Sequence, residues 1–359
     1  MISKKNIIIA SILVPLLLFF IWPEKKYKAY EVGDDFQKQV DNFYLPTMPP
    51  DWSWHYFEAD DGTKLRWGET GNRGAAKATV IIIPGYSATM SMYGEHADML
   101  ARRGYHVVGI DMRGQGGSDR YRDNQPEKLW IDDFKVYSDD LASFIKSIKS
   151  TTKQPIIPIG VSFGGHVAVR MAGEHMDVMD SLVLVAPAIV PKTGALSYKK
   201  SKFLIELSRF LGKSNRYLVG QDNWKPFRKD LSIANINLCA SNPKRLPYRD
   251  VVFTRNAEER VGGVTAQWAG EFLSSSEVIN TKAFLSSIDI PVTMISAEID
   301  HLVETNINQI SCDSIFPDCT RVDINDSGHC LFQESDDILN LIFDSVDDLL
   351  LNNSKPMAF

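Results

Sequence analysis

Three polar residues in this chain have the types and the order needed for nucleophilic catalysis: Ser162, Asp300 and His329. Ser162 lies in the stretch Gly160-Val161-Ser162-Phe163-Gly164, a G-x-S-x-G pattern between an apolar run and a helical segment. A sharp strand-to-helix turn puts the serine in strained backbone geometry and leaves no room for side chains two positions before and after it. This explains why Gly160 and Gly164 flank Ser162. The turn would expose the hydroxyl at the carboxyl edge of a sheet. The alternative is that the glycines serve only tight packing of the strand against the helix.

A serine hydroxyl is a weak nucleophile, so a base must accept its proton and an acid must orient that base. His329 follows the last apolar run in "DINDSGHCLF", and Asp300 ends the run "VTMISAEID". The order serine, aspartate, histidine is the one expected for a nucleophile elbow. Glu298 comes too early in its loop and Asp326 lies too close to His329, so both are weaker candidates for the acid. His166 falls inside the helix after the turn and is expected to be structural.

The developing oxyanion also needs hydrogen-bond donors. One is expected from the backbone N–H of Phe163, directly after the serine. The other is expected from Tyr86, in the "PGYS" loop that follows the apolar run "ATVIII". The alternative for this loop is that Pro84-Gly85 forms only a turn.

The elements that must position these residues are short apolar runs alternating with helical patterns. "WSWHYFEADDGTKLRWGE" alternates around Asp61-Gly62 and predicts a hairpin. Buried strands alternating with helices predict a mostly parallel sheet covered on both faces, which is an α/β fold. The expected strands lie at 78–83, 105–111, 156–159, 181–185, 290–300 and 321–324, and the expected helices at 93–104, 136–148, from 164, and 336–351.

The regular alternation stops at Pro187 and resumes only near residue 290, so the intervening chain is interpreted as an inserted, mainly helical cap. Residues 24–50 are charged and then proline-bearing, which is typical of a tether. The expected organisation is a membrane signal-anchor at 1–23, a tether at 24–50, a catalytic core at 51–188 and 286–359, and a cap or lid at 189–285.

The first 23 residues predict a membrane segment. The uncharged apolar run from Ile7 to Trp22 would span about 24 Å as a helix, slightly short of a hydrocarbon core of about 30 Å. It is longer than most signal-peptide cores, and no A-x-A-like cleavage site follows it, so an uncleaved anchor is favoured over a removed signal. Lysines flank the run on both sides. We expect the short amino end in the cytoplasm and the catalytic domain on the other side of the membrane.

Composition excludes several classes of function. The chain has 359 residues, 44% of them hydrophobic, and a net charge of −6, which disfavours nucleic acid as a partner. The four cysteines, Cys239, Cys312, Cys319 and Cys330, show no spacing typical of a zinc site. Cys312 and Cys319 are candidates for a disulfide in an oxidising compartment, but four buried thiols are the favoured interpretation. Neither a metal nor a cofactor is expected.

With these residues in place, the chain resembles α/β-hydrolases of the branch that holds bacterial lysophospholipases and monoacylglycerol lipases. The resemblance covers roughly residues 52–350. It rests on "PGYSATMSMYGEHADMLARRGYHVVGIDMRGQGGSD", "GVSFGG", "AEIDHLV", "SGHCLFQE" and, in the cap, "RNAEERVGGVTAQWAGEFL". The chain departs at Pro84, where many relatives have histidine. The resemblance implies a Ser162–His329–Asp300 triad and hydrolysis of the ester of a single-chain lipid. Together with the amino-terminal anchor, it leads us to expect the protein at the bacterial inner membrane.

The cap offers the best indication of the substrate. The stretch "SYKKSKFLIELSRFLGKSNR" contains six basic residues and one acidic residue. Its apolar residues recur at helical spacing and form one face: Phe203, Leu204, Leu207, Phe210 and Leu211. Such a helix can lie on anionic headgroups or meet a substrate phosphate, while an ordinary cap helix with a solvated outer side is the alternative. Trp268, Phe272 and Leu273 are candidates to line an acyl pocket, or belong to the core.

Three functions stay open on these grounds: a lysophospholipase, a monoacylglycerol lipase or carboxylesterase, and a binding protein that kept the fold without the chemistry. A lipid acyltransferase, in which a lipid alcohol replaces water in the second step, would use the same residues.

Overall fold

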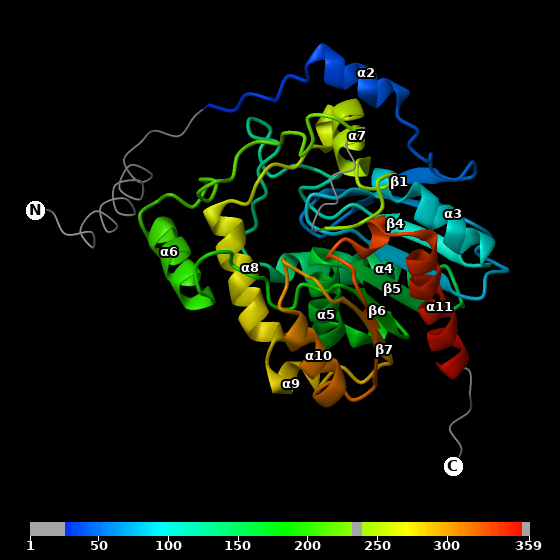
Figure 1. The fold of residues 1–359 in the computed structure, drawn as a ribbon. Helices are drawn as coiled ribbons and strands as arrows, with labels where there is room; N and C mark the ends of the chain where they lie inside the picture. The colour runs from blue at the N-terminus through cyan, green and yellow to red at the C-terminus, as the bar shows by residue number, and fades with distance from the viewer. Residues whose placement is uncertain (1–25, 232–238, 354–359) are drawn as a thin grey trace, which may run out of the picture.

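A computed structural model describes residues 26–231 and 239–353 of the protein. Its centre is an eight-stranded sheet with the order β1-β2-β4-β3-β5-β6-β7-β8 (Figure 1). The strands are β1 Ser53–Glu58, β2 Lys64–Thr70, β3 Thr79–Ile83, β4 His106–Ile110, β5 Ile156–Val161, β6 Leu182–Val185, β7 Val292–Ala297 and β8 Cys319–Ile324.

The sheet has the mostly parallel arrangement that the apolar runs predicted. All pairs from β4 to β8 are parallel, whereas β2 pairs antiparallel with both β1 and β4. Every residue of β3, β4, β5, β6 and β7 is buried, as expected of strands covered on both faces. The β1–β2 hairpin turns at Asp61-Gly62, where Gly62 adopts a φ of +84°. The predicted hairpin is therefore confirmed.

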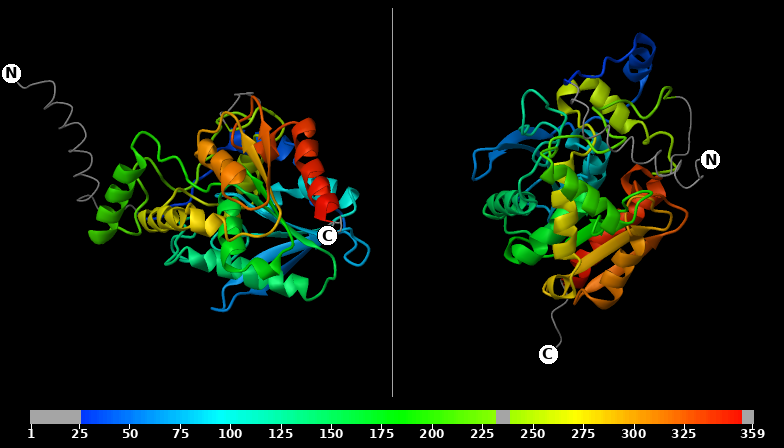
Figure 2. Two further views of the ribbon diagram at one scale, coloured as in Figure 1. Left: turned by 90° about the horizontal axis from the view of Figure 1, so that it is seen from below. Right: turned by 90° about the vertical axis from the view of Figure 1, so that its left-hand side faces the viewer.

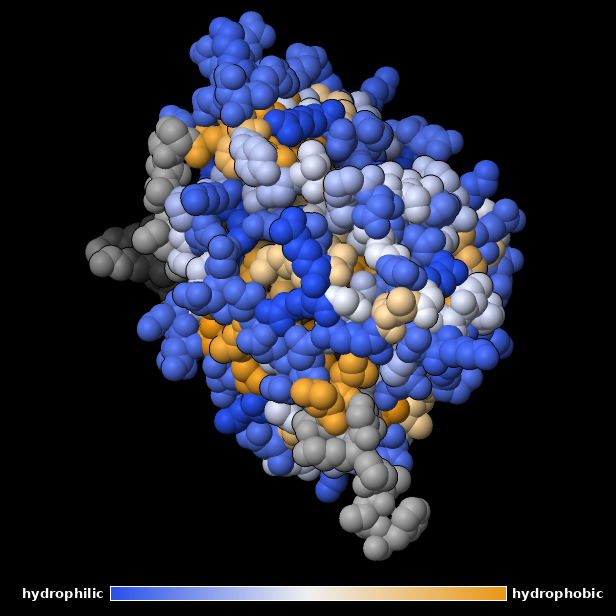
Figure 3. Space-filling model, turned by 90° about the vertical axis from the view of Figure 1, so that its right-hand side faces the viewer, coloured by the Kyte–Doolittle hydropathy of each residue, from blue (hydrophilic) through white to orange (hydrophobic). Residues whose placement is uncertain are grey.

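Helices cover both faces of the sheet. They are α3 Gly94–Arg102, α4 Lys135–Lys149, α5 Phe163–Glu174, α10 Thr305–Ser314 and α11 Asp336–Asn353. α3 and α11 lie side by side, where Arg103 binds Asp344 and Asp347 at 2.6 and 2.8 Å (Figure 1). α4 and α5 pack against each other. The surface on the side of α3 and α11 is mainly hydrophilic, with apolar side chains only in small patches (Figure 3).

The cap between β6 and β7 contains α6 Tyr198–Phe210, α7 Tyr248–Arg255, α8 Ala266–Ile279 and the short α9 Lys282–Leu285. α6 packs on α8 through Ile205, Ala269 and Leu273, and the pair stands out to one side of the sheet (Figure 2). The cap also carries strongly exposed apolar side chains, namely Phe203, Phe210, Val219 and Phe227.

The described part of the expected tether is attached to the body. It contains the helix α2 Asp34–Asn42, whose Val40 is fully buried. Arg255 Nη2 donates to the carbonyl oxygens of Val40 and Phe43, both at 2.8 Å. The expected signal-anchor at 1–23 lies outside the described residues. Within the described ranges, no helix combines the length and the apolar character needed to cross a membrane.

The favoured interpretation of four buried thiols is wrong, because the cysteines form two disulfides, Cys239–Cys330 and Cys312–Cys319. The fold brings the Cα atoms of each pair to 4.9 and 5.2 Å, which is within the range that a disulfide can bridge. Cys312–Cys319 joins α10 to the start of β8. Cys239–Cys330 joins the cap to the loop that carries His329.

Candidate active site

Ser162 occupies a sharp turn between β5 and α5. Its φ of 53° and ψ of −113° are strained for a residue with a side chain, and its N–H donates to the carbonyl oxygen of Val185 at 2.9 Å. A Cβ at Gly160 would lie 2.7 Å from the Cα of Gly165, and a Cβ at Gly164 would overlap the carbonyl oxygen of Ile83. Both glycines are therefore needed for the turn to close against its neighbours.

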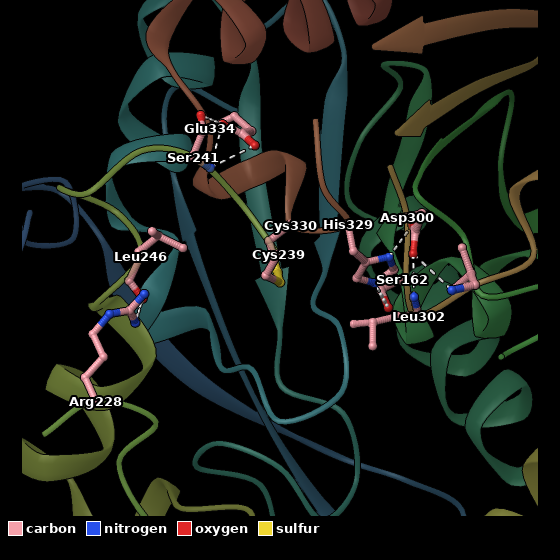
Figure 4. The surroundings of a disulfide bond; sticks show 11 residues. Ser162, Arg228, Cys239, Ser241, Leu246, Asp300, Leu302, His329, Cys330 and Glu334 are labelled. Carbon is pink, nitrogen blue, oxygen red and sulfur yellow. Dashed lines mark hydrogen bonds and ion pairs between the residues drawn. A yellow bond between two sulfur atoms is a disulfide. The ribbon is translucent and has the colours of Figure 1, made fainter. Parts of the chain in front are cut away.

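The structure brings the three predicted residues together at the carboxyl edge of the sheet (Figure 4). His329 Nε2 lies 2.7 Å from Ser162 Oγ, and His329 Nδ1 lies 2.6 Å from Asp300 Oδ2. Asp300 follows β7 and His329 follows β8, so their loops meet at the edge where the turn after β5 presents the serine. The imidazole can accept the serine proton at one nitrogen while the carboxylate binds the N–H of the other.

Asp300 is held as a carboxylate. Its Oδ1 accepts the backbone N–H groups of Leu302 and Val303 at 2.8 and 3.0 Å, and its Oδ2 faces His329. Burial raises the pKa of Asp300, but the hydrogen bond and charge of His329, with these two N–H groups, outweigh burial and bring the pKa below its usual value. Asp300 and His329 are only 4% and 6% exposed, so bulk water screens their interaction little.

The competing residues are occupied elsewhere. Glu298 Oε2 accepts the backbone N–H of Asp326 at 2.9 Å, so this carboxylate binds the loop that carries Asp326. His166 is fully buried, with Nδ1 at 2.8 Å from the carbonyl oxygen of Ala188 and Nε2 at 2.8 Å from Ser275 Oγ. Burial lowers the pKa of His166 to about 3, so this imidazole is neutral and structural, as predicted.

The loop after β3 approaches the serine closely. A Cβ at Gly85 would lie 3.4 Å from the Cβ of Ser162, which is the distance of an ordinary van der Waals contact, so the loop packs directly against the serine. No hydrogen bond from the backbone N–H of Tyr86 or of Phe163 is found within the described ranges. These are the two donors that the sequence predicts for an oxyanion. Gln115 holds the loop, since its Oε1 accepts the N–H of Ser87 at 2.6 Å.

The cap also contacts the loop after β3. The sequence did not predict these contacts. The hydroxyl of Tyr86 donates to the carbonyl oxygen of Gly262 at 2.7 Å. Glu259, buried just before it, accepts from Arg66 Nη1 at 2.7 Å and from Thr89 Oγ1 at 2.8 Å. The only sequence signal was the cap stretch "RNAEERVGG", whose resemblance to relatives did not specify these partners.

A second attachment holds the loop of His329. The Cys239–Cys330 disulfide lies beside the histidine (Figure 4), and the N–H of Cys330 donates to the carbonyl oxygen of Cys239 at 2.5 Å. Ser241 Oγ donates to Glu334 Oε2 at 2.5 Å. The disulfide and these hydrogen bonds fix the chain on the carboxyl side of His329.

Of the three residues proposed for an acyl pocket, Trp268 packs against the turn. Trp268 is 3% exposed, donates from Nε1 to the hydroxyl of Tyr137 at 3.0 Å, and packs on Tyr86 and Phe163 with ring centroids 5.1 and 5.5 Å apart. Phe272 is half-buried beside Trp268, and Leu273 is buried under α6. Trp268 thus packs on the side chains of both residues whose backbone N–H groups are predicted to bind the oxyanion.

A cavity of about 670 Å³ opens between the cap and the loop that carries Asp300. Its lining includes Lys192, Tyr198, Ser276 and His301, but none of the three proposed acyl-pocket residues. Lys192 Nζ donates to the carbonyl oxygen of Asp300 at 2.6 Å, which ties the rim of this cavity to the acid.

One group within the described residues has the geometry to hold a metal: Asp139, Glu174 and His175. Each is already engaged. His175 Nε2 lies 2.8 Å from Asp139, and Arg170 binds Glu174 at 3.1 Å. The arrangement is explained by ion pairing on the surface of α4 and α5.

Comparisons with known proteins assign the chain to a family. Residues 74–336 match the family described as serine aminopeptidase, S33. The probable lysophospholipase L2 of Haemophilus influenzae is 24% identical over 281 residues, which cover 77% of this chain and 84% of that protein. Lysophospholipase L2 of Escherichia coli K12 is 25% identical over 65% of this chain and 67% of its own. A soluble variant of monoglyceride lipase from Saccharomyces cerevisiae has a TM-score of 0.66 at 17% identity, covering 88% of this chain and 98% of that one.

Proposed function

The chain belongs to the serine aminopeptidase S33 family and has the α/β-hydrolase fold, and we propose that it is a lysophospholipase that uses Ser162 as its nucleophile. The observation that carries this proposal is the hydrogen-bonded series Ser162–His329–Asp300 at the edge of the sheet. The backbone N–H groups of the neighbouring Tyr86 and Phe163 make no hydrogen bond among the described residues. This arrangement is suited to acyl transfer from an ester.

In the proposed reaction, Ser162 Oγ attacks the acyl carbonyl while His329 Nε2 accepts its proton. Asp300 stabilises the imidazolium that forms, and the N–H groups of Tyr86 and Phe163 bind the oxyanion, each donor contributing about 10²–10³ in rate. His329 then protonates the leaving glycerol oxygen, which leaves an acyl-enzyme. Water, activated by the same imidazole, releases the fatty acid and restores the serine.

The substrate class is supported by the two lysophospholipases that align with most of this chain. The likeness to yeast monoglyceride lipase stands at 17% identity and shows the fold alone, so it does not decide the headgroup. A monoacylglycerol lipase or an acyltransferase would use the same three residues and differ only in the headgroup or in the acceptor of the acyl group. No step of the reaction calls for a metal or a cofactor.

We place the enzyme at a membrane surface, with residues 1–23 as its anchor and the catalytic domain outside the cytoplasm. Two disulfides support an oxidising compartment such as the periplasm. On α6, Phe203 and Phe210 are 66% and 87% exposed next to the exposed Lys199 and Lys200, which suits contact with anionic lipid. Deleting residues 1–23 should move the protein from the membrane to the soluble fraction, and retention at the membrane would contradict the anchor.

Turnover of a substrate panel tests the proposed function. Lysophospholipids, monoacylglycerols and short p-nitrophenyl esters would be compared, with Ser162→Ala as the control. We expect lysophospholipids to give the highest kcat/KM and the variant to be inactive. A tenfold preference for monoacylglycerol, which corresponds to about 1.4 kcal/mol in transition-state binding, would refute the lysophospholipase assignment in favour of the lipase.

A further inference from the structure

Arg249, on α7 of the cap, reaches the loop that carries the predicted oxyanion donor. Its Nε donates to Ser87 Oγ at 3.1 Å, and its side chain is only 16% exposed. Ser87 directly follows Tyr86, and Gly85 borders Ser162. The guanidinium is therefore hydrogen-bonded to the same short loop that borders the reacting serine.

Among the described residues, the guanidinium of Arg249 has one ion pair, with Asp250, and this pair is long and not hydrogen-bonded. Its Nη1 is buried and makes no hydrogen bond, and the nearest carboxylate oxygen, on Asp250, is 3.6 Å away. That carboxylate is already used, since it accepts the backbone N–H groups of Phe227 and Arg228 at 3.0 and 3.1 Å. Arg66, in contrast, is buried nearby and binds both Asp111 and Glu259.

The surroundings of Arg249 keep it charged and in a fixed plane. The guanidinium carbon lies 4.0 Å from the ring centroid of Phe227 and 5.2 Å from that of Phe253. Burial lowers the pKa of Arg249 to about 10, which leaves it protonated at neutral pH. A buried cation with an unused N–H is costly unless an anion completes it, and a planar guanidinium held by rings is well suited to a phosphate.

From this geometry we infer that Arg249 binds the phosphate of a single-chain phospholipid whose ester lies at Ser162. The inference rests on the proposed function and assigns the headgroup selectivity to one residue. In a lysophospholipid, one glycerol unit separates the ester from the phosphate, which suits an anion site one short loop away from the nucleophile. A monoacylglycerol of the same chain length has no anion to offer Arg249.

The test compares Arg249→Gln with wild type on two substrates that share one acyl chain, lysophosphatidylethanolamine and monoacylglycerol, in the same nonionic micelles. The measured quantity is the ratio of their kcat/KM values. Glutamine retains a donor for Ser87 but lacks the charge, so the ratio should fall at least tenfold. Arg249→Lys retains the charge without the planar fork and should recover part of the ratio.

Arg255→Gln is the matched control. Arg255 lies on the same helix and carries the same charge, but its guanidinium binds the carbonyl oxygens of Val40 and Phe43. Its variant should keep the wild-type ratio, so a fall in both variants would refute a specific role for Arg249. Labelling of each variant by a fluorophosphonate probe shows that its active site is folded.

The remaining outcomes separate the inference from the proposed function. If wild type shows no preference for the phosphate-bearing substrate, the lysophospholipase assignment is refuted and the inference falls with it. If wild type shows the preference and Arg249→Gln keeps it in full, the inference alone is refuted.

Discussion

The sharpest prediction concerns Asp300→Asn, which changes one atom of the site. Asp300 Oδ1 accepts two backbone N–H groups, from Leu302 and Val303, and Oδ2 faces His329 Nδ1 at 2.6 Å. In the variant, the amide oxygen must stay with the two N–H donors, because an NH₂ group there would face them directly. The amide nitrogen is then directed at His329 Nδ1.

The consequence is a change of tautomer. An NH₂ group opposite Nδ1 requires that nitrogen to accept, so the proton of the neutral imidazole moves to Nε2, which faces Ser162 Oγ at 2.7 Å. Nε2 can then no longer accept the serine proton. Loss of the correct tautomer in a serine triad costs about 10⁴ in kcat, or about 5 kcal/mol in the barrier.

The assay is turnover of a short p-nitrophenyl ester at neutral pH, with thermal unfolding measured in parallel to confirm the fold. Glu298→Gln is the matched control, because Glu298 accepts the N–H of Asp326 and does not touch the imidazole. We expect it to keep kcat within a few-fold of wild type. A loss of less than tenfold in Asp300→Asn, or an equal loss in Glu298→Gln, would refute the assignment of Asp300 as the orienting acid.

Three further predictions follow from the fold. Replacing Cys239 and Cys330 together by serine should lower the free energy of unfolding by up to about 5 kcal/mol, because the bond closes a loop across 91 positions; equal urea midpoints without reductant would contradict this. Gly164→Ala should abolish activity and lower the melting temperature, because its Cβ would overlap a carbonyl oxygen of β3; a variant with wild-type turnover would refute the packing argument. Burial lowers the pKa values of His166 and His96 to about 3 and about 4, so below the unfolded histidine pKa of about 6.5 the unfolded chain binds more protons than the folded one. The free energy of unfolding should therefore fall as pH drops from about 6.5 to 4, by up to about 1.4 kcal/mol per pH unit for each histidine. Urea titrations that give the same free energy of unfolding across this pH range would contradict the prediction.

The triad geometry was predictable because it depends on local patterns. Ser162, Asp300 and His329 each follow a short apolar run, and parallel strands deliver their carboxyl ends to one edge of the sheet. The glycines around Ser162 and the glycine of the "PGYS" loop marked the two places where backbone segments approach closely. For these features, sequence spacing and strand topology were sufficient.

The contacts of the cap were not predictable in the same way. Cys239 and Cys330 are 91 positions apart, and nothing in their spacing shows that the cap folds back onto the loop of His329. The hydrogen bonds from Arg66 to Glu259 and from Arg249 to Ser87 likewise join segments more than 150 positions apart. The cap has no regular alternation of strands and helices, so its register against the core depends on tertiary packing alone.

The central claim, that Ser162 is the nucleophile, is tested most directly by a fluorophosphonate probe followed by mass spectrometry of the labelled peptide. The account predicts one adduct, on Ser162, with none in Ser162→Ala and much slower labelling in Asp300→Asn. Labelling that persists at the same rate in Ser162→Ala, or an adduct on another residue of the wild type, would contradict it.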